Sequence, residues 1–169
     1  KVKNVRYMVL ASLFASLTAV CAWLAIPIPP LMVTLQSFGI LLALGTLGGK
    51  WGTVSTAVYL LPGSVGLPVF ARFRGGAGAL LDATGGFLWG FFLGALVYWA
   101  LERLGTLIAM IGAMLGCYLC GCLWFRSYAG GIGLGEAFLI CTAPYLVPDA
   151  VKLWLALSVS RRLRRHLPK

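Results

Sequence analysis

Two charged residues lie in a long apolar stretch near the end of the sequence. Asp149 and Lys152 are three positions apart in PYLVPDAVKLWLALSVS, residues 144–160. On a helix this spacing puts both side chains on one face, within reach of each other. A carboxylate accepts hydrogen bonds and an ammonium donates them. The pair could therefore anchor a polar solute, or it could be a salt bridge that only orients its helix.

Other groups of reactive residues do not meet the requirements of catalysis or metal binding. The single histidine, His166, lies in a basic tail, and CYLCGC (117–122) has no nearby histidine to complete a metal site. GTLGGKWG resembles a phosphate loop, but Leu44 stands where glycine is needed, and Trp51 follows Lys50 in place of Ser or Thr. We therefore expect a protein that is not an enzyme, with no metal and no cofactor.

The composition indicates an integral membrane protein. The chain of 169 residues is 60% hydrophobic and 11% charged, with a mean hydropathy of +0.93. A soluble domain carries about 25% charged residues, so this chain cannot cover a surface that faces water. A charge at the centre of a bilayer costs at least about 2.5–3.5 kcal/mol, which makes Asp149 and Lys152 a functional hypothesis by default.

The net charge of +10 is concentrated at the two ends of the chain. Basic residues that flank spanning segments mark the cytoplasmic side and attract anionic lipid headgroups. Both termini are therefore predicted to be cytoplasmic, in contact with membrane lipid. Nucleic acid is not expected as a partner, because no folded basic face is available for it. The flanking residues are Lys1, Lys3 and Arg6 at one end, and Arg161, Arg162, Arg164, Arg165 and Lys169 at the other.

The apolar runs and the turns between them predict an all-α fold with six transmembrane helices in a single domain, residues 1–169. Prolines in IPIPP end the first helix, because consecutive prolines cannot continue one. Residues 63–86 are predicted to be a loop with structure of its own. Small residues every four positions let helices pack closely, and they recur at Ala11, Ala15 and Ala19 and at Gly86, Gly90 and Gly94. The predicted helices are about 7–26, 33–48, 51–61, 84–101, 105–125 and 136–160.

The sixth helix is expected to be kinked or broken at Pro144 and Pro148. A half-helix that begins at Pro148 would direct free backbone amides towards Asp149, and broken helices are a common way to build solute sites in membranes. Asp149 precedes Arg161 by 12 residues, or about 18 Å of helix. This places it in the outer half of the membrane, so the site should open outward.

Six short segments occur in an order that resembles a known family: ASLFASLTAV, VTLQSF, LGGKWGT, GLPVF followed by a Gly-Gly loop, ATGGF and DAVK. Over residues 2–161 the chain is similar to the BioY family, the biotin-uptake substrate-binding subunits of energy-coupling-factor transporters. The resemblance implies a six-helix protein of the bacterial inner membrane that captures biotin from outside. It also implies a transmembrane coupling subunit and two ATP-binding-cassette ATPases as partners.

The resemblance also implies roles for individual residues. Asp149 and Lys152 match the Asp-x-x-Lys of the biotin site, and the chain departs from the family pattern at Val147–Pro148, at Asp82–Ala83 and at Arg74. An arginine at position 74 could contact a ligand carboxylate. The remaining matches are Arg74, Gly75 and Gly76 on a loop over the ligand, Thr34 and Gln36 at the outer end of the pocket, and Ala11 and Ala15 on the face that meets the coupling subunit.

Biotin suits the residues independently of the resemblance. Its ureido ring offers two N–H donors and an acceptor, its thiophane ring is apolar, and its side chain ends in a carboxylate. Three alternatives stay open: an uptake subunit for another vitamin, a proton-coupled secondary carrier that uses Asp149 as its relay, and a structural subunit without a ligand.

Overall fold

The computed structural model describes residues 2–28 and 31–166. Helix α1 (Val2–Trp23) leads into an antiparallel hairpin of β1 (Ala25–Ile28) and β2 (Leu31–Thr34), which pairs Ala25 with Thr34. The predicted continuation of the first helix to residue 26 is wrong. Ile and Val favour extended backbone, and a two-stranded ribbon tolerates Pro27 because each of its strands is an edge. The predicted break at Pro29 and Pro30 lies outside the described residues.

Helix α2 (Gln36–Val65) is bent at Gly48, which has φ 83° and ψ 174°. Only glycine adopts this backbone readily, and the Glu102 carboxylate accepts a hydrogen bond of 2.6 Å from the Gly49 amide beyond the bend. The boundary predicted near residues 48–52 is therefore confirmed. The prediction that the helix stops at residue 61 is wrong. Pro62 has a φ compatible with a helix, so the helix continues to Val65 and ends at Gly66, in the left-handed region.

The segment between α2 and α4 has its own structure, as predicted: a 3-10 turn η1 (Ala71–Phe73) and a short helix α3 (Ala77–Leu81). Helix α4 (Gly85–Leu101) then runs through a turn η2 (Glu102–Leu104) into α5 (Thr106–Tyr128). A β-carbon at Gly90 or Gly94 would lie 2.8 or 2.5 Å from the carbonyl oxygen of Cys117 or Ala113. The glycine repeat therefore allows α4 and α5 to pack closely.

The last apolar run forms two helices, α6 (Leu134–Cys141) and α7 (Leu146–Arg164), joined by a 3-10 turn η3 (Ala143–Tyr145) that contains Pro144. Helix α7 begins two residues before Pro148, and not at it. At the third position of a helix, the missing N–H of proline belongs to the first turn, where amide groups have no partner within the helix.

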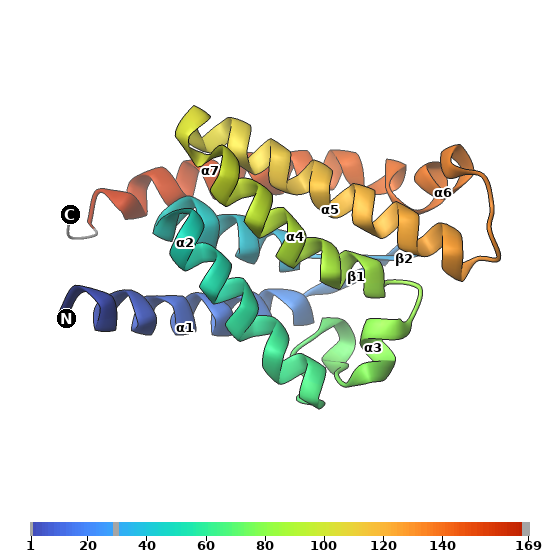
Figure 1. Ribbon diagram of the computed structural model, residues 1–169, viewed down its shortest axis with the longest axis horizontal. Helices are drawn as coiled ribbons and strands as arrows, with labels where there is room; N and C mark the ends of the chain where they lie inside the picture. Colours follow the sequence, from blue (N-terminus) through green and yellow to red (C-terminus); the bar gives the residue numbers. More distant parts are fainter. Residues whose placement is uncertain (1, 29–30, 167–169) are drawn as a thin grey trace.

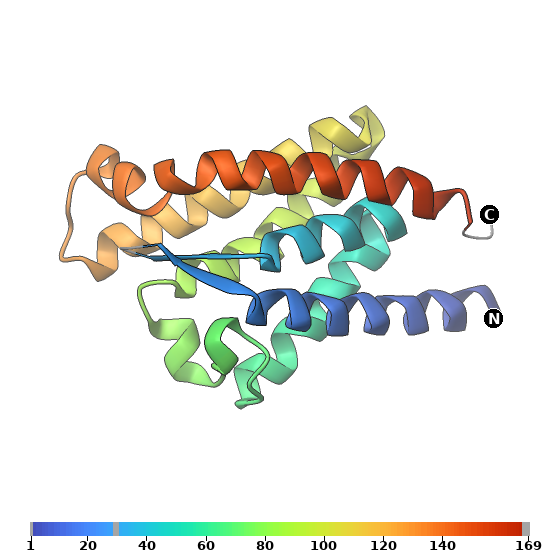
Figure 2. The ribbon, with the colours of Figure 1, turned by 180° about the vertical axis from the view of Figure 1, so that it is seen from behind.

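The helices form an elongated bundle (Figures 1 and 2). The start of α1 and the end of α7 lie together at one end, and the hairpin, α3 and α6 lie at the other. The buried core between them includes Leu44, Tyr98 and Met110. Four segments of the described chain are long and apolar enough to cross a membrane: Asn4–Trp23, Gly85–Leu104, Thr106–Tyr128 and Leu134–Arg164.

Candidate functional site: a polar network on the wall of an apolar cavity

Asp149 and Lys152 form a buried ion pair in the first two turns of α7. Lys152 Nζ lies 2.7 Å from Asp149 Oδ1. The side chain of Lys152 is only 8% exposed, and that of Asp149 is 10% exposed. The predicted contact between residues three positions apart is therefore confirmed. Burying two charges is unfavourable unless additional hydrogen bonds compensate both groups, so the surroundings of the pair decide what it can do.

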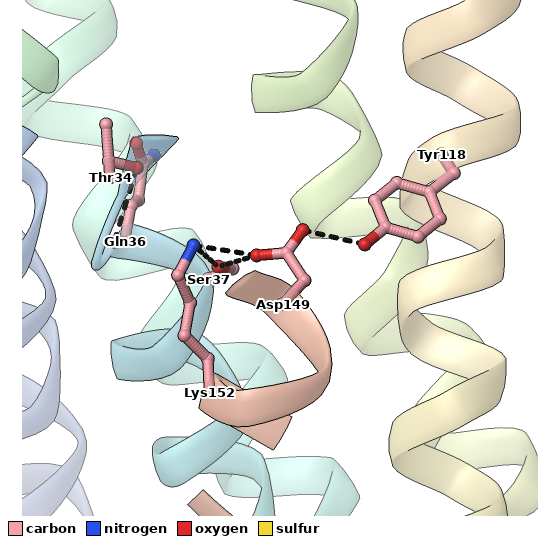
Figure 3. A network of polar contacts seen from close by, with 6 residues as sticks. All are labelled: Thr34, Gln36, Ser37, Tyr118, Asp149 and Lys152. Atoms are coloured by element: carbon pink, nitrogen blue, oxygen red, sulfur yellow. Dashed lines mark hydrogen bonds and ion pairs between the residues drawn. The ribbon is translucent and has the colours of Figure 1, made fainter. Parts of the chain in front are cut away.

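Two further side chains complete the network (Figure 3). Ser37 on α2 donates to Asp149 Oδ1 at 3.2 Å and accepts from Lys152 Nζ at 3.3 Å, while Tyr118 on α5 donates to Asp149 Oδ2 at 2.7 Å. Three helices thus hold one carboxylate in a fixed orientation. Sequence reasoning missed both residues: Ser37 lies in VTLQSF and Tyr118 in CYLCGC, but neither was assigned to the site. The available signals were weak: Ser37 follows Gln36, and a buried tyrosine hydroxyl usually needs a partner.

This network lies on the wall of a cavity that reaches from α7 to the hairpin and the η1–α3 segment. The cavity has a volume of about 150 Å³. Small-molecule sites typically have mostly apolar walls and a few polar groups. The cavity matches this description, because its wall carries the aromatic rings of Phe70, Phe87, Phe91, Tyr118 and Tyr145.

The predicted pocket residues Thr34 and Gln36 both line the cavity. Thr34 Oγ1 accepts a hydrogen bond of 3.4 Å from the Gln36 backbone amide, where β2 joins α2. The Gln36 residue is 4% exposed, and its Nε2 has no hydrogen-bond partner among the described residues. An unpaired buried amide costs about 1–3 kcal/mol. Gln36 is therefore a donor available to a ligand.

Arg74 also lines the cavity, whereas Gly75 and Gly76 are not part of its lining. The two glycines shape the loop: the Gly76 amide donates to the Gly63 carbonyl at 2.7 Å with φ 83° at Gly76, and a β-carbon at Gly75 would lie 2.1 Å from the Leu67 carbonyl oxygen. Arg74 Nη2 lies 2.5 Å from Asp82 Oδ2. The hydrogen bond from Arg74 holds the pKa of Asp82 below its usual value.

The alanines predicted to face a partner lie inside the bundle. Ala11 is 1% exposed and Ala15 is 5% exposed, and the Ala11 carbonyl accepts a hydrogen bond of 2.8 Å from Ser55 on α2. Their small side chains allow α1 and α2 to approach, which is the packing role that the four-residue spacing also predicted. In this conformation they leave no free surface for a second protein.

The described residues suit ligand binding better than metal or acid–base chemistry. No group of three or more His, Cys, Asp or Glu side chains within residues 2–28 and 31–166 could hold a metal ion. His166 is exposed just beyond α7, far along the helix from Asp149. What the cavity offers is a charged pair, a free amide and an arginine, all set in apolar walls.

Comparison with known proteins agrees with this site. The whole chain, residues 1–169, matches the model of the BioY family. The chain belongs to the BioY family. It is 38% identical over 165 residues to the biotin transporter BioY of Thermotoga maritima, an alignment that covers 95% of this chain and 96% of that protein. It is 34% identical to a probable biotin transporter BioY of Pyrococcus horikoshii, covering 92% and 94%.

A solved structure has the same fold. The crystal structure of the S-component for biotin from an ECF-type ABC transporter superimposes with a TM-score of 0.88 and 26% identity, covering 98% of this chain and 94% of that one. As a BioY family member with several long apolar helices, the chain is a multi-pass helical membrane protein. Members of this family are transporter subunits and not enzymes.

Proposed function

We propose that this protein captures biotin and mediates its uptake as the substrate-binding subunit of an energy-coupling-factor transporter. The observation that carries the proposal is the buried network of Asp149, Lys152, Ser37 and Tyr118 on the wall of a mostly apolar cavity, in a chain of the BioY family. A network supplied by three helices is a built site and exceeds what a single orienting salt bridge requires.

Biotin offers a chemical partner for each polar group of the cavity. The ureido N–H groups can donate to the Asp149 carboxylate, and the ureido oxygen can accept from Lys152 or from the free Nε2 of Gln36. The thiophane ring suits the aromatic walls, and the valerate carboxylate suits Arg74. We propose Thr34 as a support for the position of Gln36, and Gly75 and Gly76 as the residues that let the loop close over the ligand.

We further propose that the whole chain is one domain with six transmembrane segments: α1, the two parts of α2 on either side of Gly48, α4, α5, and α6 with α7. The last segment would be interrupted at η3 by Pro144, with Pro148 in the first turn of α7. The two ends of the bundle would then face opposite sides of the bacterial inner membrane. The basic termini would be cytoplasmic and near lipid headgroups, and the cavity would open outward.

The partners would be a transmembrane coupling subunit and two ATP-binding-cassette ATPases, with biotin as transported ligand and no cofactor in this chain. Ser12 and Ser16 on α1 support a docking face for the coupling subunit, because both are exposed. Their hydroxyls donate hydrogen bonds to the backbone carbonyls of Met8 and Ser12 in the same helix. With Ala11 and Ala15 buried, these serines are the small residues of α1 that remain accessible to a second helix.

A thermal-shift comparison of vitamins tests the proposal. Biotin at a hundredfold excess over its dissociation constant should stabilise the purified protein by about 2.7 kcal/mol, while thiamine and riboflavin should leave the melting temperature unchanged. The shift with biotin should be the same at pH 6 and pH 8, whereas a carrier that takes up a proton with its substrate should show a strong dependence on pH. Stabilisation by another vitamin alone would reject biotin as the ligand.

A further inference from the structure

The ion pair between Arg74 and Asp82 lies at the edge of the cavity, and only one of its members faces the ligand space. Arg74 lines the cavity, whereas Asp82, the residue that follows α3, is not part of the lining. The other charged residues of the lining, Asp149 and Lys152, neutralise each other at 2.7 Å. Arg74 is therefore a positively charged residue of the cavity lining whose partner, Asp82, does not line the cavity.

The two members of the pair are anchored to different degrees. Asp82 is fixed through its own backbone and side chain: Asp82 Oδ1 accepts from the Ala83 amide at 2.7 Å, and its carbonyl accepts from Trp124 Nε1 at 2.9 Å and from the Gly85 amide at 2.8 Å. The Arg74 guanidinium, in contrast, makes one hydrogen bond among the described residues, and it donates this bond to Asp82 Oδ2. Arg74 can therefore move away while Asp82 stays in place.

The pair is also exposed enough to exchange partners at low cost. The two side chains are 40% and 32% exposed for Arg74 and Asp82, and exposed ion pairs of this kind contribute little to stability. A second carboxylate that reached Arg74 from the cavity would replace one charge-assisted hydrogen bond by another of the same kind. Water would solvate the released Asp82.

We propose that Asp82 is a built-in competitor for the carboxylate of the ligand: it holds Arg74 while the cavity is empty and yields it when an anionic ligand enters. This inference rests on the proposed function and adds a regulatory residue to it. Asp82 makes the site less receptive to carboxylates than Arg74 alone would be. The ion pair also holds the loop closed when no ligand is bound, because Arg74 and Asp82 flank Gly75 and Gly76 in the sequence.

The test measures the affinity of the full-length purified protein for biotin and for biotinamide, which lacks the negative charge. Asp82→Asn keeps an acceptor for the Ala83 amide but removes the competing charge, so it should strengthen biotin binding about two- to fivefold and leave biotinamide binding unchanged. Arg74→Gln should weaken biotin binding and not biotinamide binding. In the Arg74→Gln background, Asp82→Asn should have no effect on either ligand.

Glu136→Gln is the matched control, because Glu136 is an exposed acidic residue in the first turn of α6, outside the cavity lining. An equal gain in biotin affinity from Glu136→Gln would overturn the proposal in favour of a general charge effect. An equal loss of affinity for both ligands in Asp82→Asn would overturn it and show that the ion pair only clamps the loop. In that case Arg74→Gln should weaken the binding of both ligands as well. Failure of the wild type to bind either ligand would reject the proposed function itself, and this proposal with it.

Discussion

Tyr118 on α5 donates a hydrogen bond of 2.7 Å to Asp149 Oδ2 on α7. The other oxygen of this carboxylate is shared by Lys152 and Ser37, so Asp149 is held from three directions before any ligand arrives. An oriented carboxylate in an apolar cavity loses little freedom when it binds a ligand, and such preorganisation favours affinity. Tyr118 is therefore as much a part of the site as the two charged residues.

The first prediction concerns the tyrosine hydroxyl. Tyr118→Phe leaves Asp149 Oδ2 without its donor in a buried position, and an unpaired buried acceptor costs about 1–3 kcal/mol. We expect biotin affinity to fall about tenfold and the melting temperature to decrease. Tyr7→Phe is the matched control, because Tyr7 stacks on Trp51 outside the cavity lining. Wild-type affinity in Tyr118→Phe would remove Tyr118 from the site.

The second prediction separates a ligand site from an orienting salt bridge. Asp149→Asn and Lys152→Ala should each weaken biotin binding strongly, and each breaks a buried pair, which typically costs about 3–5 kcal/mol of stability. The exchange of Asp149→Lys with Lys152→Asp keeps the pair but turns an ammonium towards the hydroxyl that Tyr118 donates. We expect the exchange to restore neither affinity nor melting temperature. Full recovery of both would show that the charges only orient the helix.

The third prediction revises the role of the small residues of α1. Tryptophan at Ala11 must enter the contact between α1 and α2, and overpacking a core costs about 1–3 kcal/mol or more. Ala11→Trp should therefore lower the melting temperature and the yield of folded protein. Ser12→Trp, on the exposed face, should keep both and keep biotin binding, but should reduce uptake by the assembled transporter. The packing assignment fails if Ala11→Trp melts like the wild type.

The fourth prediction concerns the loop that carries Arg74. Gly75→Ala places a β-carbon 2.1 Å from the Leu67 carbonyl oxygen, and backbone must move to relieve this contact. Gly78→Ala is the control, since nothing lies within 4 Å of the position its β-carbon would take. We expect Gly75→Ala to weaken biotin binding through the displaced loop and Gly78→Ala to leave it unchanged. Equal affinities for the two variants would mean that the loop geometry does not matter for binding.

Local pattern predicted much of the fold and half of the network. The contact between Asp149 and Lys152 follows from their spacing on one helix, and the glycines around Gly48 predict the bend in α2. Pattern could not identify Ser37 or Tyr118, which are 112 and 31 positions from Asp149 and meet it only through the packing of three helices. The hairpin was missed because IPIPP was interpreted only as the break between two helices, expected to end near residue 26 and to begin near residue 33.

The stripe of alanines on α1 illustrates a different limit. Small residues at four-residue spacing predict a close helix contact, but the spacing does not say whether the second helix belongs to the same chain or to a partner. Burial of Ala11 and Ala15 against α2 answers this for the described structure. The exposed Ser12 and Ser16 have the same spacing, one position further along the chain.

The most direct test of the account is a calorimetric titration of the purified chain with biotin in the absence of ATP and of any partner subunit. Because every residue of the proposed site lies in this chain, wild type should give a saturable heat of binding at micromolar biotin, and Asp149→Asn should give little or none. No heat and no thermal stabilisation with the wild type, or an unchanged titration with Asp149→Asn, would contradict the central claim that the Asp149 network binds biotin.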